Sequence, residues 1–221
     1  MAKSLMEKEV LKGAFSKYVT KSVVDRILQH QDGLKLGGEK KTVTIFFSDI
    51  RGFTPMSEAL SAEEVVHILN EYFTAMTAII FNYEGTLDKF MGDAIMAIYG
   101  APIDMPDHAE RAVLAAVEMS VKMQELQAKW RMEGKREVNI GIGINTGEVV
   151  VGNIGSMQRM EYTAIGDNVN LTQRLESVAE KGQILISGST YELVKHRVIA
   201  KMLDPIKVKG KAEKVIAYQV E

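Results

Sequence analysis

Two aspartates stand where apolar strand patterns stop, a position that suits metal-dependent phosphate chemistry. Asp49 follows the β-branched and aromatic run TVTIFFS of residues 42–48, and Asp93 stands at the tip of a predicted hairpin. A carboxylate at the end of a buried strand has to be solvated, paired or metal-bound. Two of them on adjacent strand ends would suit two Mg²⁺ ions about 4 Å apart, which clamp attacking and leaving oxygens in phosphoryl transfer. The alternative, that each aspartate only begins a turn, stays open at this point.

The segment after Asp49 is a candidate phosphate cradle. Gly52, Phe53 and Thr54 precede a predicted helix, so a glycine can let the backbone N–H groups approach an anion closely. The signal is weak alone because many loops contain such a triplet. The chain has no Gly-x-x-x-x-Gly-Lys-Ser/Thr run, which excludes a P-loop. Gly141 and Gly143 lie inside a predicted strand and are no dinucleotide fingerprint.

Polar residues on a third predicted helix form a second cluster. Asn170 and Arg174 are four positions apart after a predicted Asn168 cap, so they share one helix face. Asparagine can fix a ribose, and arginine can stabilise charge that develops on a phosphoryl group. On spacing alone, a solvated helix face is the favoured explanation.

The remaining polar candidates are less specific. Lys209, within VKGKA at residues 208–212, is either a mobile phosphate ligand or part of a basic surface turn. The four histidines are scattered and indicate neither a zinc site nor a Ser-His-Asp triad.

The elements that must position these residues follow a regular order. A helical lead-in is predicted over residues 5–30, and residues 35–41 read as a linker. A strand is expected over residues 42–48. One helix is expected to begin at a Ser61/Glu64 capping box, and a second at Asp107. Hairpins are expected over 87–99 and over 138–152, the second turning at residues 145–147. The rest of the pattern comprises strands over 161–165 and 183–187, helices over 168–180 and 190–196, and two strands around 207–210.

This order predicts an α+β fold with a ferredoxin-like antiparallel sheet flanked by helices. We divide the 221 residues into a lead-in and linker, 1–40, and one catalytic domain, 41–221. The net charge of −2 gives no support for a nucleic-acid partner, and the chain has no cysteine for thiolate metal sites. No apolar run reaches the roughly 20 residues that a membrane span needs, and we expect a cytoplasmic catalytic domain.

Four runs together resemble the catalytic domain of class III adenylyl and guanylyl cyclases. They are FSDIRGFT at 47–54, KFMGDAIMA at 89–97, NTGEVVVGNIG at 145–155 and YTAIGDNVNLTQR at 162–174. They occur in the family's order and spacing, and the resemblance extends from about Lys41 to the C-terminus. The run FSKYV at 15–19 is similar to the segment that joins sensor or signalling modules to bacterial cyclase domains.

The resemblance implies roles for these residues in converting ATP into cyclic AMP and pyrophosphate. Asp49, Asp93 and the Ile50 carbonyl would hold two Mg²⁺ ions, with Mn²⁺ as a substitute. Arg174 would stabilise the transition state and Asn170 would orient the ribose. Lys209 would bind the outer phosphates, and Arg159 is a weaker candidate for a phosphate or dimer contact.

The resemblance also implies how the base is read. Lys89 would donate to adenine N1, and the Thr163 hydroxyl would accept from the N6 amine, whereas guanylyl cyclases of this family tend to carry an acidic residue and a cysteine there. Adenylyl cyclases often have Asp at the second position, and a subset of bacterial-type enzymes uses Thr or Ser. A threonine hydroxyl can also turn and donate, which would admit some GTP.

In the family the site forms between two chains, so the resemblance implies a head-to-tail homodimer with two equivalent sites. An upstream sensor or signalling domain is the expected regulator. The alternatives are a guanylate cyclase or a catalytically silent dimerisation module, although none of six key residues is missing (Asp49, Asp93, Lys89, Thr163, Asn170 and Arg174). A diguanylate cyclase or polymerase palm would also use paired carboxylates but offers no role for Asn170 and Arg174.

Overall fold

The computed structural model describes residues 35–205 and 214–221. The predicted lead-in helix, the FSKYV run at 15–19 and Lys209 with its turn lie outside these residues. None of the helices in the described ranges combines the length and apolar character that a membrane crossing requires.

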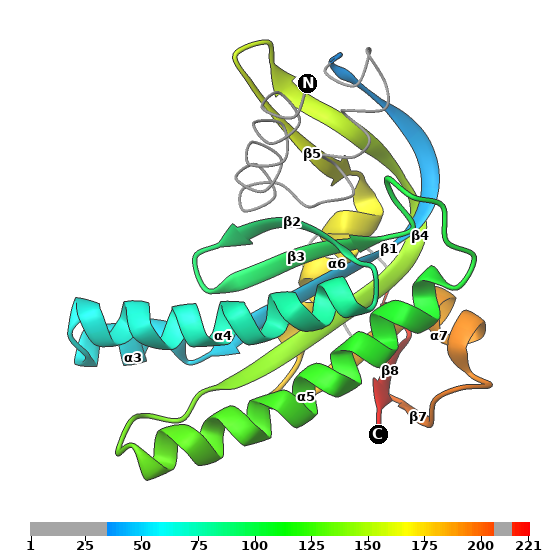
Figure 1. Ribbon diagram of the computed structural model, residues 1–221. Helices are drawn as coiled ribbons and strands as arrows, with labels where there is room; N and C mark the ends of the chain where they lie inside the picture. Colours follow the sequence, from blue (N-terminus) through cyan, green and yellow to red (C-terminus); the bar gives the residue numbers. More distant parts are fainter. Residues whose placement is uncertain (1–34, 206–213) are drawn as a thin grey trace, which may run out of the picture.

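The described chain forms an eight-stranded sheet flanked by helices (Figure 1). Along the chain the elements are β1 (Gly37–Arg51), α3 (Phe53–Ala59), α4 (Ala62–Asn82), β2 (Thr86–Met91), β3 (Ala94–Tyr99), α5 (His108–Met132), β4 (Asn139–Ser156), β5 (Arg159–Ile165), α6 (Asp167–Val178), β6 (Ile184–Ser187), α7 (Gly188–Val194), β7 (Ala200–Met202) and β8 (Ala217–Val220).

The strand order confirms the predicted ferredoxin-like arrangement. Strands β2, β3, β1 and β4 lie side by side in that order, all antiparallel, with α4 and α5 in the two connections. The sheet continues through β6, β8 and β7, and β5 pairs with β4 outside this path. The β4–β6 pair is parallel, so the complete sheet is mixed.

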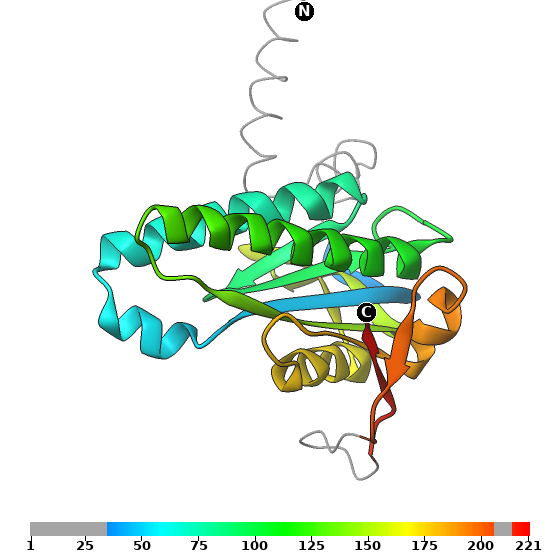
Figure 2. The same cartoon turned by 90° about the horizontal axis from the view of Figure 1, so that it is seen from below.

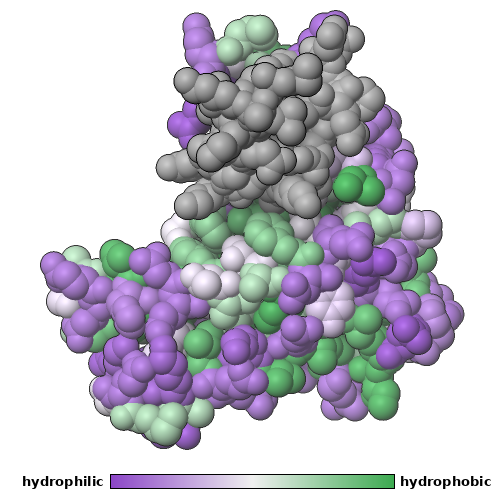
Figure 3. Space-filling view, viewed as in Figure 1, coloured by the Kyte–Doolittle hydropathy of each residue, from purple (hydrophilic) through white to green (hydrophobic). Residues whose placement is uncertain are grey.

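Helices cover both faces of the sheet, which explains the unbroken apolar run in β1. Figure 2 shows α4 and α5 on one side of the sheet and α6 on the other. Phe46 and Ile50 belong to the core cluster that contains α4 and α5 residues, while Ile45 and Phe47 belong to the opposite cluster. Alternate side chains therefore bury on opposite faces, as expected for a strand covered on both sides. The outward surfaces of α4 and α5 are mainly hydrophilic (Figure 3).

Strand β1 is longer than its apolar run at both ends. It begins at Gly37, so most of the predicted linker is strand, and it continues through Asp49 to Arg51. The interpretation that Asp49 follows the strand is therefore wrong. The strand continues because each residue from Gly37 to Arg51 has a partner on β4, with Asp49 opposite Gly141.

The predicted turn at residues 145–147 is also wrong. Strand β4 runs unbroken from Asn139 to Ser156 and pairs with β1 on both sides of this segment. Gly147 serves close packing instead of a turn, because a Cβ there would lie only 2.5 Å from side-chain atoms of Asn168 on α6. Gly143 has the same role, since its Cβ would lie 2.3 Å from the Glu176 backbone nitrogen.

Helix ends follow the predicted signals with one exception. Ser61 and Glu64 form the expected capping box of α4, and α5 begins directly after Asp107. Helix α6 is different, because Gly166 is its N-cap and Asn168 lies in its first turn. The Asn168 amide donates instead to the Glu148 carbonyl at 2.8 Å, and its oxygen accepts from Asn145, so it fastens α6 to β4.

Gly143→Ala is expected to lower the free energy of unfolding by about 1–3 kcal/mol, because the added methyl group overpacks the contact between β4 and α6. Urea unfolding measures the change. Gly188→Ala is the matched control, since a Cβ there meets nothing within 4 Å. Equal stability of the two variants would contradict close packing at Gly143.

Candidate active site

The fold brings together the three predicted metal-site residues. Asp49 lies near the end of β1 and Asp93 in the β2–β3 turn. Strand β1 pairs with β3, and the pair Ser48–Ile95 lies close to both aspartates. The Ile50 N–H donates to Asp49 Oδ1 at 3.0 Å. The Asp93 carboxyl is within hydrogen-bonding reach of the Asp49 carboxyl and the Ile50 N–H. Gly92 has a φ of 65°, as the predicted hairpin turn requires.

The electrostatics of this pair favour a bound cation. Burial, followed by the neighbouring Asp49 carboxyl, raises the pKa of Asp93 to about 7. Two adjacent carboxyl groups are more stable when they share a proton or a cation than when both carry an uncompensated negative charge. Carboxylate and carbonyl oxygens are also the ligands that Mg²⁺ prefers. The donor set of Asp49, Asp93 and the Ile50 carbonyl therefore fits divalent metal ions.

The raised pKa of Asp93 predicts how the stability of the metal-free chain depends on pH. Its folded pKa of about 7 exceeds its ordinary value of 3.8, so the folded chain binds more protons between these values. This group's contribution to stability is complete below about pH 4 and is lost as the pH rises through about 7. In EDTA, Asp93→Asn should flatten that part of the profile of unfolding free energy against pH. An unchanged slope would contradict the assignment, and Asp104→Asn, at an exposed site, is the control.

The loop after β1 has the conformation that its glycine predicted. Gly52 is left-handed, with φ 76° and ψ 25°, and is the N-cap of α3. A Cβ at Gly52 would meet nothing within 4 Å, so the glycine is needed for its φ rather than for space. Phe53 packs against the core, and Thr54 is exposed. No side chain caps α3, so its first N–H groups are not occupied by a capping side chain.

Arg51 and Glu176 are site neighbours that the sequence interpretation missed. Arg51 lies 3.7 Å from Asp49 Oδ2 and donates to Glu176 Oε1 at 2.5 Å, with both pair members largely buried. Burial raises the pKa of Glu176, while the Arg51 guanidinium opposes that shift. The pair links the carboxylate site on β1 to helix α6. An acidic residue in the buried stripe of α6 was the available signal.

Asn170 and Arg174 share a helix face, as predicted, but this face is turned away from the sheet. Thr172 and Glu176 are buried where α6 meets β4. At about 100° per residue, Asn170 and Arg174 lie roughly 200° around the helix from Thr172 and Glu176 respectively. Asn170 is exposed, and Arg174 is half-buried, with a buried Nη1 that has no hydrogen-bond partner within the described ranges. One chain therefore does not aim this pair at its own carboxylates.

Lys89 and Thr163 do meet, through a third residue that the sequence interpretation missed. The Thr163 hydroxyl donates to Asp88 Oδ2 at 2.5 Å, and the Lys89 ammonium lies 3.5 Å from Asp88 Oδ1. Lys89 also forms an ion pair with Glu161 on β5. Arg159 is exposed and reaches the same Glu161 at 3.5 Å. Strands β2 and β5 thus bring the predicted base-reading residues side by side.

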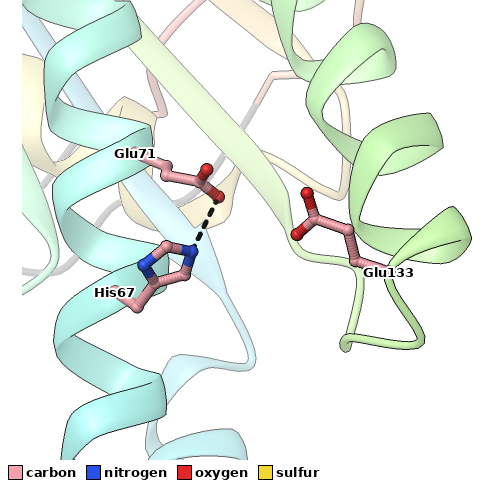
Figure 4. Close-up of side chains that lie close together, drawn as sticks. All are labelled: His67, Glu71 and Glu133. Carbon is pink, nitrogen blue, oxygen red and sulfur yellow. Dashed lines mark ion pairs between the residues drawn. The ribbon is translucent and has the colours of Figure 1, made fainter.

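A separate group of His67, Glu71 and Glu133 joins α4 to the end of α5 (Figure 4). One ligand atom from each lies within 4.8 Å of the others, although the sequence pattern gave no sign of a histidine cluster. Glu71 already accepts from Lys129 and from Trp130 Nε1, and Lys135 contacts both His67 and Glu133. Two lysines balance the two carboxylates, so in this structure the group links α4 to the end of α5 through ion pairs.

The comparisons with known proteins agree with this geometry. Residues 37–221 match the family model described as the adenylate and guanylate cyclase catalytic domain. Adenylate cyclase 1 of Rhizobium meliloti is 33% identical over 208 residues, which cover 93% of this chain and 31% of that protein. The chain therefore spans about a third of that relative's length.

Two solved structures are similar in both sequence and fold. The adenylyl cyclase CyaB from P. aeruginosa has a TM-score of 0.82 and 44% identity, over 84% of this chain and 96% of that one. The guanylyl cyclase Cya2 has a TM-score of 0.78 and 45% identity, over 84% and 94% of the respective chains. The identity is thus nearly the same to a structure named as an adenylyl cyclase and to one named as a guanylyl cyclase.

Proposed function

Because the chain belongs to the adenylate and guanylate cyclase catalytic domain family, we propose that it is an adenylate cyclase, which converts ATP into 3′,5′-cyclic AMP and pyrophosphate. The observation that carries the proposal is the pairing of two separate groups in one chain. The carboxylates of Asp49 and Asp93 lie together, and Lys89 and Thr163 lie together beside Asp88.

In this proposal Asp49, Asp93 and the Ile50 carbonyl hold two divalent ions, Mg²⁺ or Mn²⁺. When bound, such ions make the ribose 3′-hydroxyl more acidic and neutralise charge on the phosphates. The backbone N–H groups of Gly52, Phe53 and Thr54 cradle the triphosphate. Lys209 and Arg159 add positive charge near the outer phosphates.

The reaction is an intramolecular displacement. The ribose 3′-oxygen loses its proton to solvent and attacks the α-phosphorus in line, and the bond from that phosphorus to the bridging oxygen of pyrophosphate breaks. Asn170 orients the ribose for this attack. The Arg174 guanidinium stabilises the negative charge that develops at the α-phosphate.

Lys89 and Thr163 select adenine. The Lys89 ammonium donates to adenine N1, and the Thr163 hydroxyl accepts from the N6 amine. Guanine presents a donor at N1 and an acceptor at O6, so both contacts would be mismatched. Buried polar groups left unpaired in this way discriminate strongly between substrates.

We further propose that two chains pair head to tail and that each complete site uses both. The support is the orientation of α6, whose Asn170 and Arg174 face away from the sheet and its carboxylate pair. A second chain that presents its α6 to Asp49 and Asp93 would complete the constellation. By symmetry such a dimer would contain two equivalent sites.

An upstream sensor or signalling domain and a cytoplasmic location remain proposals. The first rests on the length of the Rhizobium relative, which extends far beyond the matched region. The second rests on the proposed substrate, because ATP is a cytoplasmic metabolite.

The direct test is an assay with ATP and GTP in parallel, with Mg²⁺ and with Mn²⁺, across a protein dilution series. We expect cyclic AMP from ATP, slower cyclic GMP from GTP, and a rate per chain that falls on dilution. Preferential use of GTP would favour a guanylate cyclase. If the purified dimer forms neither cyclic AMP nor cyclic GMP, a silent dimerisation module would be favoured.

A further inference from the structure

A buried carboxylate lies beneath both proposed base-reading side chains. The Asp88 side chain has no exposed surface, and its two oxygens face Thr163 and Lys89 respectively. We propose that Asp88 sets the preference for adenine by holding the Thr163 hydroxyl in one orientation, as a hydrogen-bond acceptor toward the base. This inference rests on the proposed function and names the residue that makes its base selection strict.

An irregularity in β2 gives Asp88 this position. In the β2–β3 ladder Leu87 pairs with Ala97 and Lys89 with Met96, so Asp88 is an extra residue in β2. In a regular strand Asp88 and Lys89 would point to opposite faces. The bulge lets both side chains reach β5, where Thr163 and Glu161 lie. Such bulges re-aim side chains and are common next to active sites.

The hydrogen-bond chemistry fixes the direction of the Thr163 hydroxyl. An ionised carboxylate only accepts, and a hydroxyl has one hydrogen to give. Because the Thr163 oxygen lies 2.5 Å from Asp88 Oδ2, the hydroxyl hydrogen is committed to Asp88. The remaining lone pairs of Thr163 can only accept, which suits the N6 amine of adenine and repels the O6 of guanine.

Lys89 helps to keep Asp88 ionised. Burial raises the pKa of the Asp88 carboxyl, but the Thr163 hydroxyl and the Lys89 ammonium both act in the opposite direction. The ammonium lies 3.5 Å from Asp88 Oδ1, an oxygen that has no hydrogen-bond partner within the described residues. The Asp88 carboxylate therefore contacts both members of the proposed base-reading pair, the donor Lys89 and the acceptor Thr163.

Asp88→Asn tests the inference with little change in shape. The amide NH₂ can donate to Thr163, which frees the hydroxyl to donate to guanine O6. We expect the ratio of kcat/KM for ATP to that for GTP to fall about tenfold, the value of one charged hydrogen bond. Glu161→Gln is the matched control, because Glu161 also pairs with Lys89 but does not contact Thr163. Its ratio should stay within about twofold of wild type.

A double-mutant cycle separates this role from a structural one. If Asp88 acts through the hydroxyl, Asp88→Asn should not lower the ratio further in a Thr163→Val background. Thr163→Ser, which keeps the hydroxyl, should keep the wild-type ratio even if Asp88→Asn proves unstable in thermal unfolding. Equal ratios for Thr163→Ser and Thr163→Val would overturn the inference.

The outcomes distinguish the inference from the proposed function. A wild-type chain that makes cyclic AMP while Asp88→Asn keeps its selectivity overturns the role of Asp88 alone. Equal losses of selectivity in Asp88→Asn and Glu161→Gln also overturn it, because the effect would then act through the charge of Lys89. A wild-type chain that makes no cyclic AMP overturns the proposed function and this inference with it.

Discussion

Replacing Asp49 with asparagine is expected to lower kcat for cyclic AMP formation by at least about a thousandfold. Asparagine has nearly the same shape but lacks the charge that the proposed metal site needs. The Asp49 carboxylate lies beside Asp93, and Arg51 approaches it at 3.7 Å. An uncharged amide in its place would leave Asp93 as the only carboxylate of the metal site.

The measurement is the initial rate with saturating ATP and Mg²⁺, together with thermal unfolding to verify the fold. Glu148→Gln is a suitable control, since Glu148 is an exposed carboxylate paired with Lys40 on the same sheet. Its rate should equal that of the wild type. Full activity of Asp49→Asn would contradict the two-metal assignment.

Replacing Arg174 with alanine is expected to lower kcat about a hundredfold to a thousandfold and to change KM much less. The reason is that Arg174 would act mainly on charge that develops after ATP has bound. Its buried Nη1 has no hydrogen-bond partner in the described parts of the chain. Lysine should restore little of the rate, because an ammonium lacks the planar fork of a guanidinium.

Arg131→Ala is the control for this prediction, because Arg131 is an exposed helical arginine whose partner is Glu137. Steady-state kinetics of both variants with ATP give kcat and KM separately. A rise in KM with unchanged kcat would assign Arg174 to ground-state binding and contradict a role in the transition state.

Local patterns predicted most elements and their order. The Ser61/Glu64 capping box, the apolar stripe of α4 and the Gly92-Asp93 hairpin are confirmed, and they give the ferredoxin-like sheet. These features depend on residues close together in the chain. That is why periodicity and capping rules sufficed to predict them.

The errors arose where a distant contact decides the structure. The segment of residues 145–147 has the composition of a turn. It nevertheless lies in β4, where it pairs with β1 and where α6 packs closely against Gly147. Asp49 has the position of a strand end, yet β4 continues its pairing to Arg51. Local propensity cannot reveal a partner strand or helix that lies far away in the sequence.

The candidate site shows the same division. The residues in recognisable motifs were predicted, and the fold brings Asp49 to Asp93 and Lys89 to Thr163. Asp88 was missed because its role depends on a bulge in β2, and the Arg51–Glu176 pair was missed because it depends on the packing of α6 against β1. Lys209 remains a prediction, since it lies outside the described residues.

The most direct test of the account is a mixing experiment with the two variants Asp49→Asn and Arg174→Ala. Each alone should be nearly inactive, because every site of its homodimer lacks one essential group. In a mixed dimer, one of the two sites would combine the intact Asp49 of one chain with the intact Arg174 of the other. Mixing equal amounts should restore cyclic AMP formation to about a quarter of the wild-type rate, since half of the exchanged dimers each contain one complete site. No gain in rate on mixing, with dimer exchange verified, would contradict a site that is shared between two chains.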